Sequence, residues 1–197
     1  MLLLTLAGAG AVGGGAFLVL VRHGLSARDE PTAMEAWMAR ATRRLATPRR
    51  IREARSPVPL TGEAVARARA HFADHCASCH GNDGRGQTTV GRNLYPKAPD
   101  MSQPATQSLS DGELYSIIRN GVRLTGMPAW GGDTAEDDRE TWELVLFIRR
   151  LPAITPEEAR QMEALNPRSP KEYEEEEEAR RFLEGRDAPA PPPAQKH

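Results

Sequence analysis

The sequence predicts an all-α protein, and three observations support this prediction. Apolar residues recur at helical spacing in several segments. Most of these segments open on a serine or threonine suited to cap a helix. No segment shows the alternation of apolar and polar residues that a half-buried strand requires. With 197 residues, 39% of them hydrophobic, and a formal net charge of −1, the chain suits one small domain with appended segments rather than a nucleic-acid-binding protein.

The first segment, residues 1–21, carries no charged side chain. An apolar run of this length can cross a bilayer as a helix, so we expect a transmembrane anchor here. A cleaved signal peptide is the alternative, but no convincing small-x-small cleavage site follows Val21. Arg22 and Arg28 come after the run, and by the positive-inside rule they would place the rest of the chain in the cytoplasm.

Residues 22–59 are expected to form an amphipathic helix followed by an arginine-rich connector. A stripe of large apolar residues recurs at helical spacing, and its members are Met34, Trp37, Met38, Ala41 and Leu45. We expect this stripe to pack on the domain or to lie at a membrane surface, rather than to contact a cofactor. Seven arginines fall within residues 40–55, against one glutamate. They can attract anionic lipid or an acidic partner, or they can line a solvated stalk.

The domain itself is expected over residues 60–152. Thr61 is placed to cap a helix over residues 64–75, and the apolar face of this helix leads toward the two cysteines of the chain. Residues 81–108 are rich in Gly, Pro, Asn and Thr without a helical period, which predicts a long loop. Two further helices are expected over residues 111–120 and 135–151.

The only two cysteines, Cys76 and Cys79, stand in the pattern Cys-x-x-Cys-His with His80. This is the attachment pattern of a c-type haem. Two thiols one helical turn apart can add to the two vinyl groups of a porphyrin, and the next residue can bind the iron through its imidazole. We therefore expect one covalent haem c, held by Cys76 and Cys79, with His80 as an axial ligand. Haem is attached in this way outside the cytoplasm, so the motif takes precedence over the orientation that Arg22 and Arg28 favour.

The second axial ligand of an electron-transfer haem is a soft or nitrogen donor. Among the six methionines, Met127 is the preferred candidate because Gly126 and Pro128 flank it, which keeps the loop extended, and because helices are expected on both sides. Met101, within the loop over residues 81–108, is the rival. A thioether ligand stabilises ferrous iron, which suits an electron carrier.

Over residues 60–152 the chain resembles the class I mono-haem cytochromes c, small electron carriers of respiratory chains. The resemblance rests on Phe72 four residues before the first cysteine, on the Ile-Arg-Asn-Gly segment that leads to Thr-Gly-Met127-Pro, and on the closing helix. It implies the small helical fold of that family, wrapped around one covalent haem.

The resemblance also implies two contacts around the haem site. The first and last helices of the domain would cross with Phe72 against Phe147, and with Ala68 where the family often has glycine. A backbone carbonyl in the loop after the motif would orient the proximal histidine. Pro96 and Pro99 both remain candidates for that carbonyl.

Beyond the domain, residues 153–187 are expected to form a charged helical extension. Thr155 and Ser169 each precede a proline and stand three residues before a glutamate, as helix caps do. Residues 188–197 are rich in proline and alanine and are expected to form a disordered tail.

Two interpretations of the cysteine motif without haem deserve comparison. A redox dithiol normally accompanies a βαβ unit, and the sequence indicates none. A zinc site would combine the two cysteines with two of the three nearby histidines, His71, His75 and His80. Such a set would be crowded on one helix, which gives poor tetrahedral geometry.

The expected protein is therefore an electron-transfer protein and not an enzyme in its own right. It would be a single-pass protein of the cytoplasmic (inner) membrane, with its haem domain facing the periplasm. Its partners would be a reductase or dehydrogenase that donates electrons and an oxidase or reductase that accepts them. A fixed subunit of a larger membrane oxidoreductase is the alternative. A haem-based sensor is disfavoured because Met127 would close the sixth position on the iron.

Overall fold

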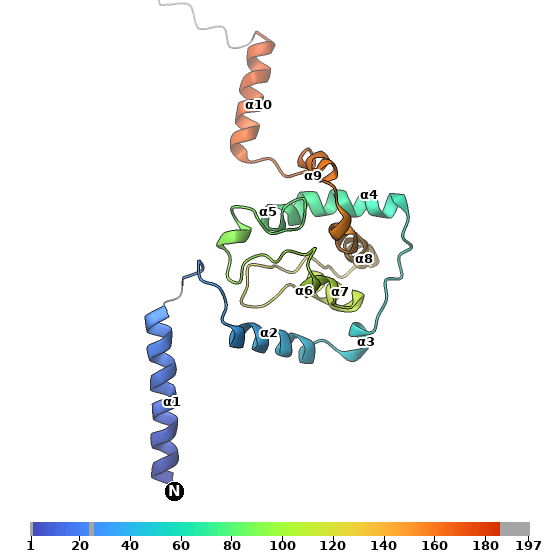
Figure 1. Cartoon of the computed structure of the whole chain (residues 1–197). Coiled ribbons are helices and arrows are strands. Elements are labelled where there is room, and N and C mark those ends of the chain that lie inside the picture. The colour runs from blue at the N-terminus through green and yellow to red at the C-terminus, as the bar shows by residue number, and fades with distance from the viewer. Residues whose placement is uncertain (1, 24–25, 186–197) are drawn as a thin grey trace, which may run out of the picture.

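The computed structural model describes residues 2–23 and 26–185, and within them the chain is helical with no β-strand (Figure 1). The α-helices are α1 Leu2–His23, α2 Ala33–Ala46, α3 Arg49–Arg52, α4 Gly62–His71, α5 Ala77–His80, α6 Pro104–Gln107, α7 Asp111–Asn120, α8 Ala135–Arg150, α9 Pro156–Glu163 and α10 Pro170–Leu183. Three short helical turns of other types are η1 Phe72–Cys76, η2 Gly91–Asn93 and η3 Leu151–Ala153. The predicted all-α class is confirmed.

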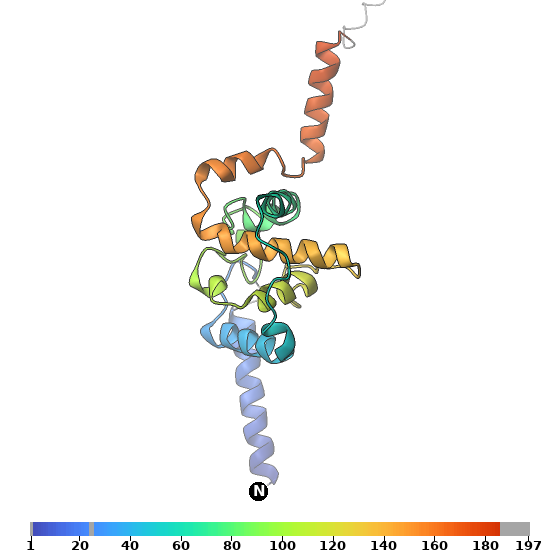
Figure 2. The ribbon, with the colours of Figure 1, turned by 90° about the vertical axis from the view of Figure 1, so that its right-hand side faces the viewer.

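The centre of the domain is the crossing of α4 over α8, which Figure 2 shows with α8 running across the molecule beneath α4. The rings of Phe72 and Phe147 lie 5.0 Å apart between their centroids, at an interplanar angle of 49°. Ala68 is buried at the same crossing, where its small side chain allows the two helices to approach closely. The aromatic contact that the family resemblance implied is therefore present.

A buried carboxylate also joins these two helices. Glu143 of α8 is only 1% exposed, and its Oε1 accepts a hydrogen bond from Nη2 of Arg67 at 2.7 Å. Nε of Arg67 lies 3.2 Å from both carboxylate oxygens, and Arg139 on the preceding turn of α8 donates to the same group. A charge in the core needs such partners, because desolvation would otherwise disfavour it.

Helix α7 also packs on α8, and it begins with a capping box. The Ser110 side chain accepts from the backbone N–H of Glu113, and the Glu113 carboxylate accepts from the N–H of Ser110. The ring of Tyr115 stacks on that of Trp142 at 4.4 Å. On this helix Leu114, Tyr115 and Ile118 are buried in the core.

The arginine-rich connector is fastened to the start of α7. Ser110 Oγ donates a hydrogen bond of 2.6 Å to the carbonyl of Arg52. A Cβ at Gly112 would lie 1.6 Å from the carbonyl oxygen of Ile51, so only glycine permits this approach between α3 and α7. The connector is thus held against the domain along α3.

The stripe on α2 does not pack on the domain. Its large members, Met34, Trp37, Met38 and Leu45, are between 53% and 87% exposed. A full capping box of Thr32 and Glu35 begins helix α2, and the N–H of Thr47 donates to the carbonyl of Arg43 at its end, so both ends of the helix are satisfied. Of the two alternatives expected for this stripe, packing on the domain is wrong, because arginines of α2 line the side of the helix that faces the domain; a position at a membrane surface stays a prediction.

Helix α1 covers the segment in which a transmembrane anchor was expected, except for residue 1, which lies outside the described residues. Of the helices within the described residues, none combines the length and the apolar character needed to cross a membrane. Figures 1 and 2 show α1 projecting away from the domain, on the side where α2 lies.

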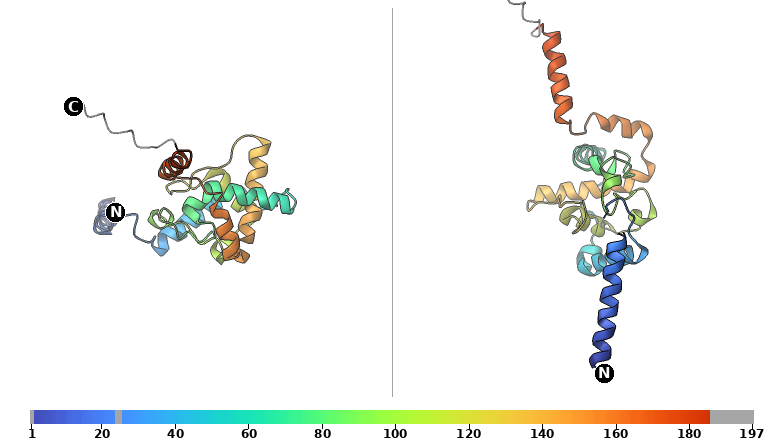
Figure 3. Two further views of the ribbon diagram at one scale, coloured as in Figure 1. Left: turned by 90° about the horizontal axis from the view of Figure 1, so that it is seen from above. Right: turned by 90° about the vertical axis from the view of Figure 1, so that its left-hand side faces the viewer.

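The hydrophobic core continues beyond residue 152. Met162 of α9 is fully buried, and it belongs to the same cluster as Phe72, Leu144 and Leu151. Helix α10, in contrast, stands clear of the domain (Figure 3), and its Phe182 and Leu183 are exposed. The tail expected over residues 188–197 lies outside the described residues.

Candidate haem site

The cysteine motif lies at the end of a continuous helical path that starts at α4. Thr61 caps this path as predicted, because its side chain accepts from the N–H of Ala64 at 3.1 Å. The path passes through the π-helical turn η1 and ends in α5, which contains Cys79 and His80. A π turn inserts one extra residue, so it changes which residues face the core just before the motif. Gly81 then ends the helix with a φ of +73°.

Both cysteines are half-buried and neither forms a disulfide. Burial raises the pKa of the Cys76 thiol to about 12, and the neighbouring Cys79 acts in the same direction. Cys76 is therefore a neutral thiol at physiological pH. A redox dithiol depends on a cysteine whose pKa is lowered, so this environment disfavours that interpretation.

The His80 imidazole is held neutral by its surroundings. Burial lowers its pKa, while the backbone carbonyl of Pro99 acts in the opposite direction. The Pro99 carbonyl thus lies beside the ring, and the Nδ1 atom of the ring is buried without a hydrogen-bond partner. Of the two candidate carbonyls, Pro99 is thus the one that lies beside the ring. A carbonyl at Nδ1 orients an imidazole so that its Nε2 can bind a metal.

The loop after the motif is fastened back onto it. The N–H of Gly86 donates to the carbonyl of His80 at 2.7 Å, and Thr88 Oγ1 donates to the carbonyl of Cys79 at 3.0 Å. A Cβ at Gly91 would lie 2.1 Å from the same Cys79 oxygen, so the loop passes too close for any larger residue. The predicted loop over residues 81–108 is confirmed as mostly irregular, with only η2 and α6 within it.

Met127 lies half-buried in the loop between α7 and α8. Its N–H donates to Thr125 Oγ1 at 3.1 Å, and its carbonyl accepts from the N–H of Val122 at 3.0 Å. Gly121 ends α7 with a φ of +64°, and a Cβ there would lie 2.7 Å from the Met127 carbonyl oxygen. The methionine is therefore held in a tight, self-bonded turn.

Two contacts bring the motif and the Met127 loop side by side. The ring of His75, which precedes Cys76, meets the ring of Trp130 edge-on at 5.1 Å. A Cβ at Gly126 would lie 2.6 Å from Cδ2 of Leu94, so the loop that follows the motif packs against the Met127 turn. Sequence reasoning did not assign a role to Trp130 or Leu94, since neither belongs to a periodic segment that would indicate its partner.

Comparison with known proteins bears on the same region. The family model described as "Cytochrome C oxidase, cbb3-type, subunit III" matches residues 63–148. A similar protein is the "Cbb3-type cytochrome c oxidase subunit FixPc" of Rhizobium leguminosarum bv. viciae, which is 35% identical over 81 residues. The match covers 41% of this chain and 25% of that protein, so the chain spans about a quarter of the length of the relative.

Residues 63–148 form a mono-haem c-type cytochrome domain. A domain of this kind carries covalently bound haem c and serves in electron transfer. The predicted kind of protein and the predicted cofactor are thereby confirmed.

The residues of the cytochrome domain fit this group. The domain offers two neighbouring thiols, and beside them a neutral imidazole that has a buried, unpartnered Nδ1 and the Pro99 carbonyl close to its ring. Within the described residues, no group of three or more His, Cys, Asp and Glu side chains could hold a metal ion. The structure therefore gives the zinc alternative no support.

The structure also separates the competing methionines. Met101 is buried in the hydrophobic cluster with Phe72 and Leu144, so its side chain serves as core packing. Met162 is buried in the same cluster, whereas Met34 and Met38 lie exposed on α2. Met127 differs from these four, because its side chain is neither buried in the core cluster nor exposed on α2, and because Trp130 in its loop contacts His75 before the motif.

Proposed function

We propose that this protein is a one-electron carrier of a membrane respiratory chain, with haem c attached at Cys76 and Cys79 and its iron bound by His80 and Met127. The observation that supports this assignment best is the packing of the Met127 turn beside the motif, through Trp130 on His75. Two axial donors on opposite sides of a ring must come from two such segments.

The haem supplies the reversible one-electron change of its iron, and the chain supplies attachment, ligation and exclusion of water. Cys76 Sγ and Cys79 Sγ would hold the porphyrin through thioether bonds. His80 Nε2 would be the proximal donor, with the Pro99 carbonyl orienting the ring. Met127 Sδ would close the opposite position, which favours the ferrous state and leaves no site for a gaseous ligand.

Replacement of the methionine tests the axial assignment. In oxidised Met127→Ala we expect the loss of the far-red sulfur-to-iron charge-transfer band, because the thioether donor is gone. The matched control is Met101→Leu, which keeps the volume of a buried side chain and should keep the band. A band that persists in Met127→Ala and disappears in Met101→Leu would assign the ligand to Met101 instead.

Replacement of one cysteine tests the attachment. Cys76→Ala is expected to prevent stable folding, because a domain of this size has a thin core and the haem fills part of it. The control is Ser78→Ala, which changes an exposed side chain inside the same motif and should leave the holoprotein intact. Circular dichroism and covalent haem staining report both outcomes, and a well-folded Cys76→Ala protein without haem would contradict the prediction.

We further propose that the segment over residues 1–21 holds the domain at the periplasmic face of the inner membrane, as a single-pass anchor. Its support is the absence of charged side chains over this segment and the continuous helix α1. Against it stands the finding that no described helix is long and apolar enough to cross a membrane. Extraction of native membranes with alkaline carbonate separates the two cases, since only an inserted anchor keeps the haem in the membrane pellet.

A fixed subunit of an oxidase complex is the second candidate function. The observation that favours it is the similarity to a protein named as a cbb3-type oxidase subunit. Purification of the native protein in mild detergent distinguishes the two. A mobile carrier elutes alone and exchanges electrons with both a donor reductase or dehydrogenase and an acceptor oxidase or reductase, whereas a subunit elutes with oxidase activity.

A further inference from the structure

The outer face of α2 is an apolar surface that the described residues leave uncovered. Met34, Trp37, Met38 and Leu45 recur at i, i+3, i+4 and i+11 on this 14-residue helix, so they share one face. All four are more than half exposed. We call these four residues the α2 stripe. A row of large apolar side chains exposed together marks an interaction surface, in contrast to scattered single residues.

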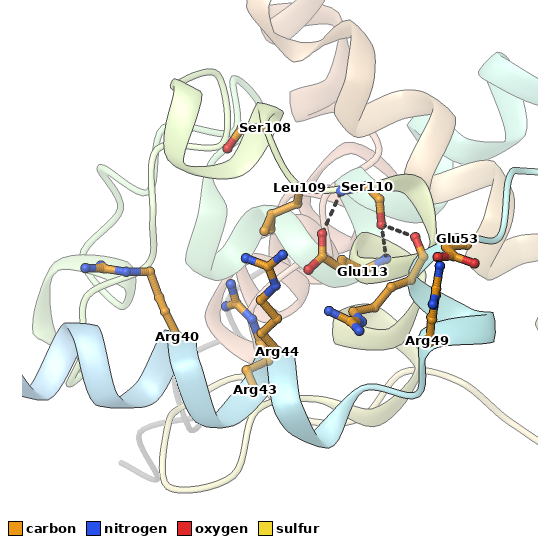
Figure 4. A pocket seen from close by; sticks show the side chains of 10 residues that line it. Arg40, Arg43, Arg44, Arg49, Glu53, Ser108, Leu109, Ser110 and Glu113 are labelled. Carbon is orange, nitrogen blue, oxygen red and sulfur yellow. Dashed lines mark hydrogen bonds and ion pairs between the residues drawn. The ribbon is translucent and has the colours of Figure 1, made fainter.

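The opposite side of α2 is strongly basic. Together with α3 and the start of α7 it borders a cleft of about 670 Å³, shown in Figure 4. The arginines that line this cleft are Arg40, Arg43, Arg44, Arg49 and Arg52. Its two acidic residues are already engaged, Glu53 with Arg49 and Glu113 with the backbone of Ser110.

Three of these arginines have no anionic partner within the described part of the chain. Arg40, Arg43 and Arg44 all lie on α2 and form no ion pair there, and the Nε of Arg52 is buried without a hydrogen-bond partner. Nearby carboxylates therefore do not neutralise the cleft, and it attracts anions. We call Arg40, Arg43 and Arg44 the α2 arginines.

Helix α2 is fixed on the domain at both ends, so the domain presents its stripe in one direction. Before the helix, Glu30 forms an ion pair with Lys97 of the loop after the motif. After it, the connector is tied to α7 by the hydrogen bond from Ser110 to Arg52. A surface held in this way can set the orientation of the whole cytochrome domain.

Helix α2 is also the next helix after α1, whose residues 2–21 carry no charged side chain. Figures 1 and 2 show α2 lying across the direction of α1, on the side of the domain from which α1 departs. A helix that lies flat beside an apolar segment, with an apolar face and basic neighbours, has the arrangement of an interfacial membrane helix.

We propose that α2 docks on an anionic phospholipid surface, with the α2 stripe among the acyl chains and the α2 arginines on the lipid phosphates. Trp37 suits the headgroup boundary, because its ring is apolar and its N–H is polar. Arginine pairs with phosphate through a planar fork of donors, and its aliphatic stem can pass along the helix to reach the headgroups. Docking would fix the direction in which the haem edge faces its partners. The proposal rests on the chain being at a membrane, and not on which residues bind the iron.

The experiment places a nitroxide on either side of α2 in the full-length holoprotein. Met34→Cys puts the label in the α2 stripe, and the control Ala39→Cys puts it at an exposed position on another side of the same helix. The ferrous protein is bound to vesicles of phosphatidylcholine, with or without a third of phosphatidylglycerol. With the anionic lipid we expect the Met34→Cys label to become accessible to oxygen and shielded from a water-soluble nickel chelate. The Ala39→Cys label should stay accessible to the chelate.

The charge requirement is tested by adding Arg40→Gln, Arg43→Gln and Arg44→Gln to the Met34→Cys protein. Each arginine near an anionic surface strengthens binding by about fivefold, so the triple change should lower the docked-to-undocked ratio by on the order of 100-fold. Equal shielding on pure phosphatidylcholine, or unchanged shielding in the triple variant, would overturn the assignment to anionic lipid. Shielding that appears only when a partner protein is added would overturn it as well.

The same samples separate this proposal from the anchor proposal. Flotation of the vesicles in a density gradient shows which of them carry the protein. If the protein floats with both kinds of vesicle while the Met34→Cys label stays accessible to the chelate on both, the anchor proposal is supported and the docking of α2 is refuted. A chain that floats only with anionic vesicles, with the label shielded, supports the docking and refutes the anchor.

Discussion

His71 shows how a single residue near the motif responds to its surroundings. Its Nδ1 lies 3.6 Å from Oε2 of Glu140, and its ring lies 4.9 Å from that of His75. Burial lowers the pKa of His71 more than the Glu140 carboxylate raises it. The folded protein therefore favours the neutral imidazole, in a helix whose next turn leads into the cysteine motif.

This lowered pKa predicts a pH dependence of stability. Between the folded pKa of His71 and its ordinary value of 6.5, the unfolded chain binds more protons than the folded one. Stability is thus retained above pH 6.5 and falls as the pH drops through the folded pKa. His71→Gln should weaken this fall, as measured by thermal unfolding across the range. Glu140→Gln should extend it to lower pH, because it removes a group that raises the pKa of His71. An identical pH profile in all three proteins would contradict the assignment.

At the scale of elements, the contact between α4 and α8 combines an aromatic pair with a buried ion pair. Periodicity identifies the apolar face of each helix, and the family resemblance supplies the Phe72–Phe147 contact. Periodicity and the resemblance both fail to predict that Glu143 is buried, because glutamate is mostly found exposed to solvent. The π turn η1 is also missed, because a single inserted residue is too short to alter the helical period of the sequence.

Glu143→Gln is expected to destabilise the domain by about 2 kcal/mol, because charge-assisted hydrogen bonds to a buried carboxylate are replaced by neutral ones. Glu63→Gln is the matched control, since Glu63 pairs with the same Arg67 but is 84% exposed. An exposed pair of this kind contributes little, so the control should have no measurable effect. Denaturant unfolding of both holoproteins checks the difference, and equal losses would show that burial does not decide the strength of these pairs.

At the scale of the whole molecule, the cytochrome domain extends beyond the region that resembles the family. The chain turns at η3 and sends α9 back onto the core, where Met162 is fully buried. The connector before the domain is likewise fastened to α7. The structure thus joins both flanking segments to the domain and leaves α1 and α10 projecting from it (Figure 3).

Truncation of the buried methionine measures the role of α9 in stability. Met162→Ala should lower the free energy of unfolding by about 3 kcal/mol, since it removes a fully buried side chain and leaves a cavity. Met34→Ala, at an exposed methionine, should change it by less than about 0.5 kcal/mol. Denaturant titration followed by circular dichroism gives both values. A Met162→Ala protein as stable as the Met34→Ala protein would show that α9 is not part of the cooperative unit.

The sequence by itself determined the features that depend on adjacent residues. The spacing of Cys76, Cys79 and His80 predicts covalent haem, and the caps at Thr61 and Ser110 set where helices begin. These are local properties, because a thiol pair or a capping box is completed within one or two turns of chain.

The tertiary structure decided what each predicted face contacts. It buries Met101 and Met162, exposes the α2 stripe, and places Pro99 rather than Pro96 beside the His80 ring. Helical period shows that a residue lies on an apolar face, but burial of that face depends on which other segment packs against it. That choice is made by contacts between residues far apart in sequence, and periodicity carries no information about them.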